Sequence, residues 1–490
     1  MVGVPRSAGC PLCVKRRIRC DQARPGCANC ARYGVECPGY GRSFKFVTGG
    51  KHKVRSNGSR RRRPADAEHR AEIKTGGGGA GSGSDSSGGV GVLELRPTRA
   101  QFIDGIIQTL RQGSSADEIV VFAPWFGDVP AHLGTKVALD SAMAAFALHL
   151  LGKAEKSDRL VGESRSVYGQ SLVALQRALN HPTEWKTAET LCATMTLCLF
   201  ELFAGTNDPS ATSNGNTSPD PSSWMTHAAG VSWLIQQRGA GVYRDSAWDK
   251  SMMLSFRTLI IMNSIFCGHD CFLAKKEWQS VLLNLSPEDR SRGVTTEAAR
   301  VYDRYFAHLA RVPAIIRVGL GLREAKRRGL AIDVGQAVAL VTDTANLHAD
   351  YLIWFDEYQR LVPSPVEIPS RDPESIFDTA IHFSNVWHGS LYMGYWTTVF
   401  ILQTVLVDCA YPVDFTEDNK QLLGKVFRAV ETVGKGYMGP YRIGYPVRIA
   451  YEFADVPTQV YLLSVLARTE KHYAATSPVG YPRPGTRGMA

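Results

Sequence analysis

This sequence lacks several features of secreted, membrane-bound or β-rich proteins. The first residues, MVGVPRSAGC, contain no apolar run, so we expect no secretory signal peptide. No useful stretch alternates apolar with polar residues and no βαβ rhythm appears, which argues against a sheet-based fold. The motifs H-E-x-x-H and G-x-S-x-G are also absent, and we expect no enzymatic activity.

Charged residues are absent from one long run, residues 379–407, which is long enough to be considered as a membrane span. It contains polar side chains, including His382, Asn385, His388 and Gln403, and no Lys/Arg cluster flanks it. Because such groups suit lipid poorly, we favour a buried helix and expect no membrane partner.

The net charge of +10 is concentrated at one end of the 490-residue chain. Residues 1–74 contain 18 Lys and Arg against 5 Asp and Glu, which leaves 38 against 41 for the remainder. A basic end joined to a nearly neutral body indicates a module that binds a polyanion, most often nucleic acid.

Six of the 11 cysteines fall in one short segment, CPLCVKRRIRCDQARPGCANCARYGVEC. Their spacing, C-x2-C-x6-C-x6-C-x2-C-x6-C, is one half repeated after 17 residues. The six are Cys10, Cys13, Cys20, Cys27, Cys30 and Cys37.

Metal binding explains this block better than disulfides, which need an oxidising compartment, or coincidence, which would not repeat the spacing. Two cysteines separated by two residues can reach one zinc ion at about 2.3 Å. One tetrahedral Zn²⁺ would leave two cysteines unused, and two ions need eight ligands from six sulfurs. Two ions therefore fit if two thiolates bridge them.

The two halves of the block differ in charge. The second half has only Arg32 in the stretch ARYGVE, whereas the first half has four cations: Lys15, Arg16, Arg17 and Arg19. If each C-x2-C pair begins a short helix, the first helix presents cations and the second supports it. Arg or Lys can donate to guanine N7 and O6, and phosphate contacts position such a module.

This block resembles the fungal zinc binuclear cluster family, Zn2Cys6, in every cysteine gap. The resemblance implies two Zn²⁺ ions bridged by Cys10 and Cys27, and recognition of CGG-type triplets in the major groove of double-stranded DNA. It places the base contacts on Arg16 and Arg17, with Arg17 the first choice. Supporting phosphate contacts would come from Lys15 and Arg19. Val14 departs from the basic residue usual in the family and weakens the expected phosphate binding.

A disordered linker is predicted over residues 39–91, because its composition is first basic and then rich in glycine and serine. It has no a/d heptad run, so it offers no coiled coil. We interpret its arginine run as a nuclear-import signal: Arg60, Arg61, Arg62 and Arg63.

Helical periodicity dominates the body of the chain. We expect helices at residues 137–151, 157–180, 187–205, 224–239, 251–266, 295–327, 331–360, 374–409, 418–434 and 456–472. Residues 205–223 read as a disordered insertion, because all but Ala211 are Gly, Pro, Ser, Thr, Asn or Asp.

The predicted organisation is a small cluster domain and a large all-α domain. The segments are a disordered N-terminus (1–9), the cluster (10–38), the linker (39–91), the helical domain (92–476) and a disordered tail (477–490).

The helical domain resembles the regulatory domain that accompanies many such clusters. The resemblance is carried by residues 168–179, 189–203 and 224–239, with the landmarks Trp224, His227, Gly230, Arg238 and Gly239. It implies no catalysis and regulation of nuclear genes, often those of metabolism or of clustered biosynthetic pathways.

Two other groups of polar residues carry weaker signals. Cys267, His269 and Cys271, in CGHDC, are more typical of packing on an apolar helix than of a metal site. Asp414, Glu417 and Asp418 are more typical of a helix N-terminus than of an acidic metal motif.

The sequence thus predicts a nuclear, zinc-dependent DNA-binding regulator of RNA polymerase II genes, whose body contacts the transcription machinery or co-regulators. The alternative is a zinc-folded module that binds a protein. A monomer and a homodimer both remain open.

Overall fold

The computed structural model of the protein describes residues 12–13, 16, 18, 20–21, 27–35, 37, 124–204, 223–283, 296–436, 438–469 and 484. The predicted N-terminus, the linker, residues 205–222 of the predicted insertion, and the tail apart from residue 484 lie outside the described residues.

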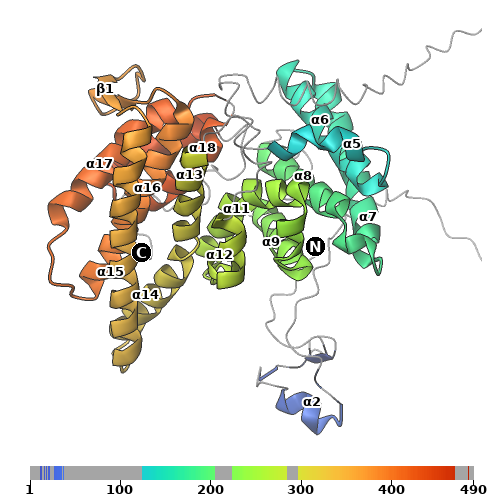
Figure 1. The fold of residues 1–490 in the computed structure, drawn as a ribbon, viewed down its shortest axis with the longest axis horizontal. Coiled ribbons are helices and arrows are strands. Elements are labelled where there is room, and N and C mark those ends of the chain that lie inside the picture. The colour runs from blue at the N-terminus through green and yellow to red at the C-terminus, as the bar shows by residue number, and fades with distance from the viewer. Residues whose placement is uncertain are drawn as a thin grey trace, which may run out of the picture.

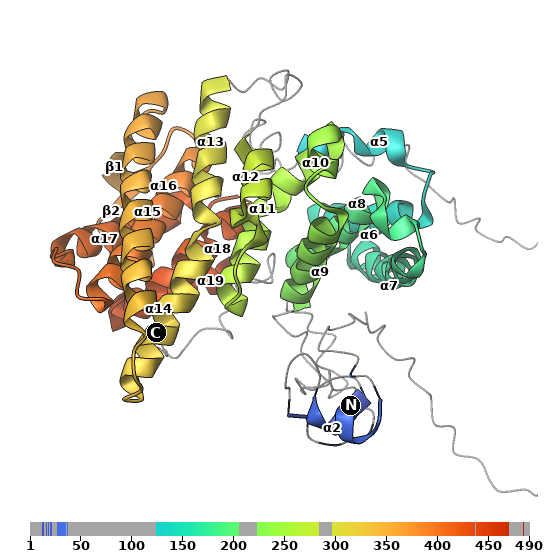
Figure 2. The ribbon, with the colours of Figure 1, turned by 60° about the horizontal axis from the view of Figure 1, so that its bottom comes forward.

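The body is built almost entirely from helices. They are α5 (Val129–His132), α6 (Val137–Ala154), α7 (Asp158–Asn180), α8 (Ala188–Ala204), α9 (Ser223–Arg238), α10 (Val242–Asp245), α11 (Ala247–Cys267), α12 (Lys276–Leu283), α13 (Thr296–Leu309), α14 (Val312–Arg327), α15 (Val334–Leu361), α16 (Val386–Asp408), α17 (Thr416–Val433), α18 (Gly439–Ala450) and α19 (Val456–Thr469). Short 3-10 helices lie at Pro124–Gly127, Glu184–Lys186, Phe272–Ala274 and Tyr451–Phe453. Helices α5 to α9 gather at one end and α13 to α19 at the other, with α11 between them in both views (Figures 1 and 2).

Two helices form the centres of these groups. Helix α8 buries residues on every side, as its nearly continuous apolar sequence predicts. Helix α16 does the same in the other group, where it packs against α14, α15, α17 and α18. By length and composition both α6 and α16 are apolar enough to cross a membrane, but 83% of the apolar window of α16 is buried inside the fold. A buried core helix also meets these criteria of length and composition.

The predicted helix over residues 374–409 is wrong in its first part. Helix α16 starts only at Val386, where Asn385 accepts a hydrogen bond from the Trp387 amide at 2.8 Å. The preceding residues form a two-stranded antiparallel sheet of β1 (Val366–Pro369) and β2 (Thr379–His382). The predicted all-α domain therefore contains one small hairpin, whose strands are too short to show alternation.

The predicted helix over residues 295–327 is two helices, α13 and α14. The second begins at Val312 with Pro313 in its first turn. Proline has no amide hydrogen and its ring collides with the preceding turn, so it suits a helix start and not a helix interior.

Helix α18 was not predicted, because its sequence, GPYRIGYPVRIA, contains two glycines and two prolines. Packing compensates for the poor helix propensity. Its buried Arg442 donates from Nε to the carbonyl of Val433 at 2.9 Å, which satisfies an acceptor at the end of α17.

Candidate metal centre

The cysteine sulfurs of the N-terminal block gather in two groups of three. Sulfurs of Cys13, Cys20 and Cys27 all lie within 4.8 Å of one another, and so do those of Cys27, Cys30 and Cys37. Cys27 belongs to both groups. Cys10 lies outside the described residues.

Cys27 is held by the local backbone of the second half. It is the N-cap of α2 (Ala28–Arg32), and its Sγ accepts from the amide of Cys30 at 3.3 Å. Asp21, between the halves, accepts from the amide of Ala28 at 3.1 Å. The two halves are therefore joined at the start of α2.

The sulfur geometry fits a shared metal and does not fit a disulfide. The Sγ atoms of Cys13 and Cys27 are 3.6 Å apart, whereas a disulfide bond is about 2.05 Å long. Thiolates at about 2.3 Å from one tetrahedral zinc would be separated by about 3.8 Å. Cys13, Cys27 and Cys30 are almost fully buried, as ligands of a closed structural site would be.

Arg16 contacts the second half of the block directly. Its guanidinium carbon lies 3.6 Å from the centre of the Tyr33 ring, and its amide donates to the carbonyl of Leu12 at 3.0 Å. A cation over an aromatic face is attracted by the ring quadrupole. Arg16 therefore ties the helical turn after Cys13 to the residue that ends α2.

The other predicted DNA contacts lie outside the described residues, namely Lys15, Arg17 and Arg19, as does the arginine run from Arg60 to Arg63. Tyr33 was not selected from the sequence. The sequence feature that could have indicated Tyr33 is the 17-residue repeat, because Tyr33 occupies the position in the second half that Arg16 occupies in the first.

In the helical domain, the landmark pair Arg238-Gly239 has a structural explanation. Arg238 Nη1 lies 2.7 Å from Asp249 Oδ1, and the two side chains are 3% and 7% exposed. Arg238 Nε also donates to the carbonyl of Lys186 at 2.8 Å. Gly239 adopts a φ of +80°, which a glycine accommodates without steric cost. The arginine thus joins the end of α9 to α11 and to the segment before α8.

The landmark His227 lies against Tyr168, whose hydroxyl is 3.4 Å from His227 Nε2. Burial lowers the pKa of His227 and raises that of Tyr168, so both are held neutral. This contact packs α9 against α7.

The CGHDC residues are not on one helix, which corrects the prediction that they pack there. Helix α11 ends at Cys267, and Gly268 takes the left-handed conformation as its C-cap, with a φ of +66°. Cys271 is buried, and burial raises the pKa of its thiol to about 11. The described residues give these two thiols no metal-binding geometry.

The acidic residues near α17 are divided between two roles. Asp414 accepts from the amide of Thr416 at 2.9 Å, just before the helix, whereas Asp418 accepts from Gln403 at 2.6 Å. The interpretation as a helix start is consistent with Asp414, while Asp418 links α17 to α16.

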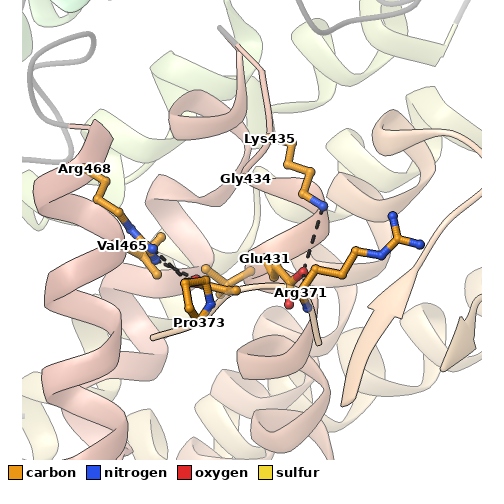
Figure 3. A pocket seen from close by; sticks show the side chains of 9 residues that line it. Arg371, Pro373, Glu431, Gly434, Lys435, Val465 and Arg468 are labelled. Atoms are coloured by element: carbon orange, nitrogen blue, oxygen red, sulfur yellow. Dashed lines mark hydrogen bonds and ion pairs between the residues drawn. The ribbon is translucent and has the colours of Figure 1, made fainter. Parts of the chain in front are cut away.

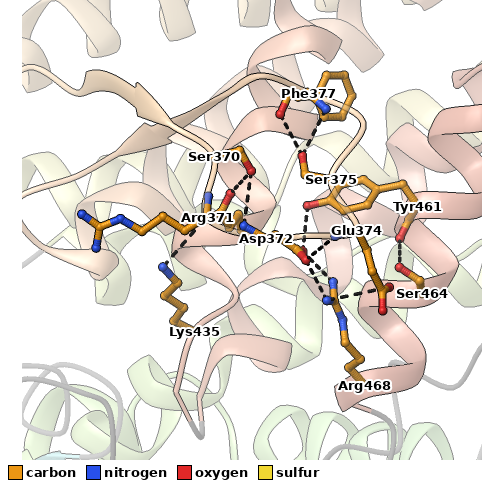
Figure 4. A network of polar contacts seen from close by, with 11 residues as sticks. Ser370, Arg371, Asp372, Glu374, Ser375, Phe377, Lys435, Tyr461, Ser464 and Arg468 are labelled. Carbon is orange, nitrogen blue, oxygen red and sulfur yellow. Dashed lines mark hydrogen bonds and ion pairs between the residues drawn. The ribbon is translucent and has the colours of Figure 1, made fainter.

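A cavity of about 330 Å³ lies between the loop after β1, α17 and α19 (Figure 3). Most of its charged side chains are paired with one another or with neighbouring polar groups, although the guanidinium of Arg371 has no hydrogen bond or ion pair among the described residues. Asp372 accepts from Arg468 at 2.9 and 2.6 Å, and from the Tyr461 hydroxyl at 3.4 Å (Figure 4). Glu431 accepts from the Ser370 hydroxyl at 2.7 Å. These contacts fasten the loop to the helices, so we assign the cavity no ligand.

Comparisons with known proteins agree with both parts of this description. Residues 8–45 match the family described as the fungal Zn(2)-Cys(6) binuclear cluster domain, and residues 128–312 match the fungal specific transcription factor domain. No solved structure matches the chain.

Two relatives are similar over limited segments. An uncharacterized protein of Emericella nidulans is 25% identical over 178 residues, which cover 36% of this chain and 35% of that protein. A Zn(2)-C6 fungal-type transcription factor of Gibberella zeae is 53% identical over 30 residues, 6% of each protein. The matched segments thus span about a third of the first relative and a small part of the second. By these two matched segments the chain is similar to the fungal Zn(2)-Cys(6) transcription factors, with a cysteine cluster suited to zinc and a helical domain that matches the fungal specific transcription factor domain.

Proposed function

We propose that this protein is a nuclear, sequence-specific regulator of RNA polymerase II genes that reads CGG-type triplets through a two-zinc cluster. The observation that carries the proposal is the pair of sulfur groups that share Cys27. Two ions need eight ligand positions, and six sulfurs supply them when two are shared.

The internal repeat supports the assignment of Cys10 as the second shared ligand, which the family resemblance implies. Because the spacing repeats after 17 residues, Cys10 occupies the position in the first half that Cys27 occupies in the second. The group of Cys27, Cys30 and Cys37 in the second half therefore corresponds to a group of Cys10, Cys13 and Cys20 in the first. Cys10 then joins both groups, as Cys27 does. The proposed ligand set is therefore all six cysteines, with Cys10 and Cys27 bridging. Zinc bound there would supply the folding energy that such a short segment cannot obtain from an apolar core.

The cations of the first half supply the DNA contacts. Arg17 is proposed to read guanine, while Lys15 and Arg19 contact phosphates. Arg16 has a second role that its sequence position did not suggest: stacked on Tyr33, it orients the basic turn against the second half.

The rest of the chain connects this module to regulation. The linker of residues 39–91 tethers the cluster, and Arg60 to Arg63 direct nuclear import. The helical domain contacts the transcription machinery or co-regulators. No catalytic step is proposed for it.

Selection of bound sites from random duplex DNA, with the full-length protein, tests the DNA-binding function. We expect enrichment of CGG-type triplets, binding that is lost with a strong chelator, and a log–log salt slope near −0.9 per neutralised phosphate. Zinc-loaded protein that enriches no sequence and shows no salt dependence would favour the protein-interaction module instead.

Single substitutions test the residue roles. Arg17→Ala should relax the triplet preference, whereas Lys15→Ala should weaken all duplexes about equally. Tyr33→Ala should weaken binding about twofold to fivefold, from loss of an exposed cation–π contact of about 0.5–1 kcal/mol, and Tyr33→Phe should preserve it. Equal binding by the alanine and phenylalanine variants at Tyr33 would disprove the orienting role of Arg16.

A further inference from the structure

A cavity of about 540 Å³ lies where α13 packs against α12 and α15. Helix α13 stands between the other two helices in both views (Figures 1 and 2). Glu297, Arg300 and Arg304 line the cavity from α13, and their spacing of three and four residues places them on one face of that helix. The end of α15 and the last residue of α12, Leu283, complete the walls. The volume falls in the range of roughly 300–1,000 Å³ that is typical of small-molecule sites.

The walls of this cavity are held in place by contacts between α13 and α15. Nε1 of Trp354 donates to the carbonyl of Val301, which lines the cavity, at 2.7 Å, and both side chains are buried. Nη1 of Arg304 donates to Glu357 at 3.3 Å between the same two helices. Because these contacts shape the cavity in advance, a ligand that enters it has little reorganisation to drive.

The charges that line the cavity favour an anionic ligand. They are three arginines and two glutamates, which leaves an excess of positive charge. Arg300 has no hydrogen bond or ion pair among the described residues. Arg360, on α15, is paired with Asp356 one turn earlier, and these two side chains are 71% and 65% exposed. Exposed pairs of this kind contribute little to stability, so Arg360 can exchange Asp356 for a ligand.

Apolar side chains line the same cavity. Leu283 is 43% exposed and Leu361 is 37% exposed, whereas Val301 is buried. A ligand with both a negative charge and a hydrocarbon part would use both kinds of wall. Guanidinium groups bind a carboxylate through two parallel hydrogen bonds, and covering exposed leucine side chains removes apolar surface from water.

We propose that this cavity binds a small organic acid, whose carboxylate lies between Arg300 and Arg360 and whose hydrocarbon part packs against Leu283 and Leu361. Such a ligand would connect α13 to α15 within the helical domain. An inorganic anion would use the arginines but would leave the leucines exposed, so the lining favours a carboxylate that carries a hydrocarbon chain.

Ligand-detected NMR with the full-length, zinc-loaded protein tests the proposal, with hexanoate as the probe. A ligand of this size should bind with a dissociation constant of about 1 mM or below. Acetate should bind at least about tenfold more weakly, because it lacks the methylene groups that the leucines cover. Hexanamide, which keeps the chain and loses the charge, and inorganic phosphate should also bind at least about tenfold more weakly.

Substitutions locate the site. Arg300→Gln and Arg360→Gln should each weaken hexanoate binding about tenfold or more, from loss of a charge-assisted hydrogen bond. Arg159→Gln on α7 is the matched control, because Arg159 is 77% exposed and, like Arg360, is paired with an acid four residues away. The thermal unfolding midpoint should be nearly the same for all three variants, since the substituted side chains are exposed.

Three results would overturn the proposal. One is the absence of hexanoate binding at about 10 mM, ten times the expected dissociation constant. Another is acetate or phosphate binding as tightly as hexanoate, and the third is hexanoate binding that neither arginine substitution weakens. All of these measurements can be made whether or not the cysteine cluster binds DNA, so a failure here is distinct from a failure of the proposed function.

Discussion

Replacing Cys27 with alanine should weaken both metal sites at once, because its sulfur belongs to both sulfur groups. A cysteine found in only one group, such as Cys20, should affect mainly one site. Structural zinc in small peptides contributes about 10–16 kcal/mol, so an equal share for each of four thiolates is about 2.5–4 kcal/mol. Cys20→Ala should reduce the free energy of zinc binding by about that much. Cys27→Ala removes one ligand from each of the two sites, so the expected loss is about 5–8 kcal/mol, and it also removes the N-cap of α2.

The assay is zinc competition between the full-length protein and a chromophoric chelator, with bound ions counted by native mass spectrometry. We expect two ions in the wild type, a reduced count in Cys20→Ala and none in Cys27→Ala at the same chelator concentration. Cys267→Ala, an exposed cysteine of the helical domain, is the control and should bind zinc as the wild type does. Equal losses of zinc affinity for Cys20→Ala and Cys27→Ala would refute the shared role of Cys27.

Three further predictions concern the stability of the helical domain, each measured by urea unfolding. Asp249→Ala should cost about 3–5 kcal/mol, because it leaves a buried guanidinium without its carboxylate; a cost below about 1 kcal/mol would contradict this. Burial lowers the pKa of His149 to about 4, below its unfolded value of 6.5. The unfolded state therefore binds the proton more readily between these values, and His149 should cost about 2 kcal/mol of stability on going from pH 7 to pH 5. His149→Gln should lose less over the same interval, and an identical loss would exclude His149 as the cause. Gly394→Ala should cost about 1–3 kcal/mol, because the new methyl would overlap the Tyr305 hydroxyl, whereas Gly424→Ala meets open space and should be neutral or stabilising.

The helical domain shows how far local periodicity can predict a fold. Most long helices were predicted within a few residues, including α7, which starts after Ser157 as its N-cap. One error came from strands too short to show alternation, at residues 374–385, and two others involved proline or glycine. Pro313 divides a predicted helix in two, yet Pro446 lies inside α18 because tertiary packing compensates for the propensity cost.

The sequence by itself determined the metal chemistry and the charge asymmetry of the N-terminal block. Thiolate number and spacing are local properties, and they limit the possible ligand sets before any fold is known. The two halves of the repeat also differ in charge whatever their arrangement, since only the first is strongly basic.

Only the tertiary structure decided which groups meet. It placed Cys27 in both sulfur groups, stacked Arg16 on Tyr33 and paired Arg238 with Asp249. It also buried α16 among four neighbouring helices. Contacts between residues distant in sequence depend on how helices pack. Apolar periodicity predicts which face of a helix is buried, but it does not identify the element that packs against that face.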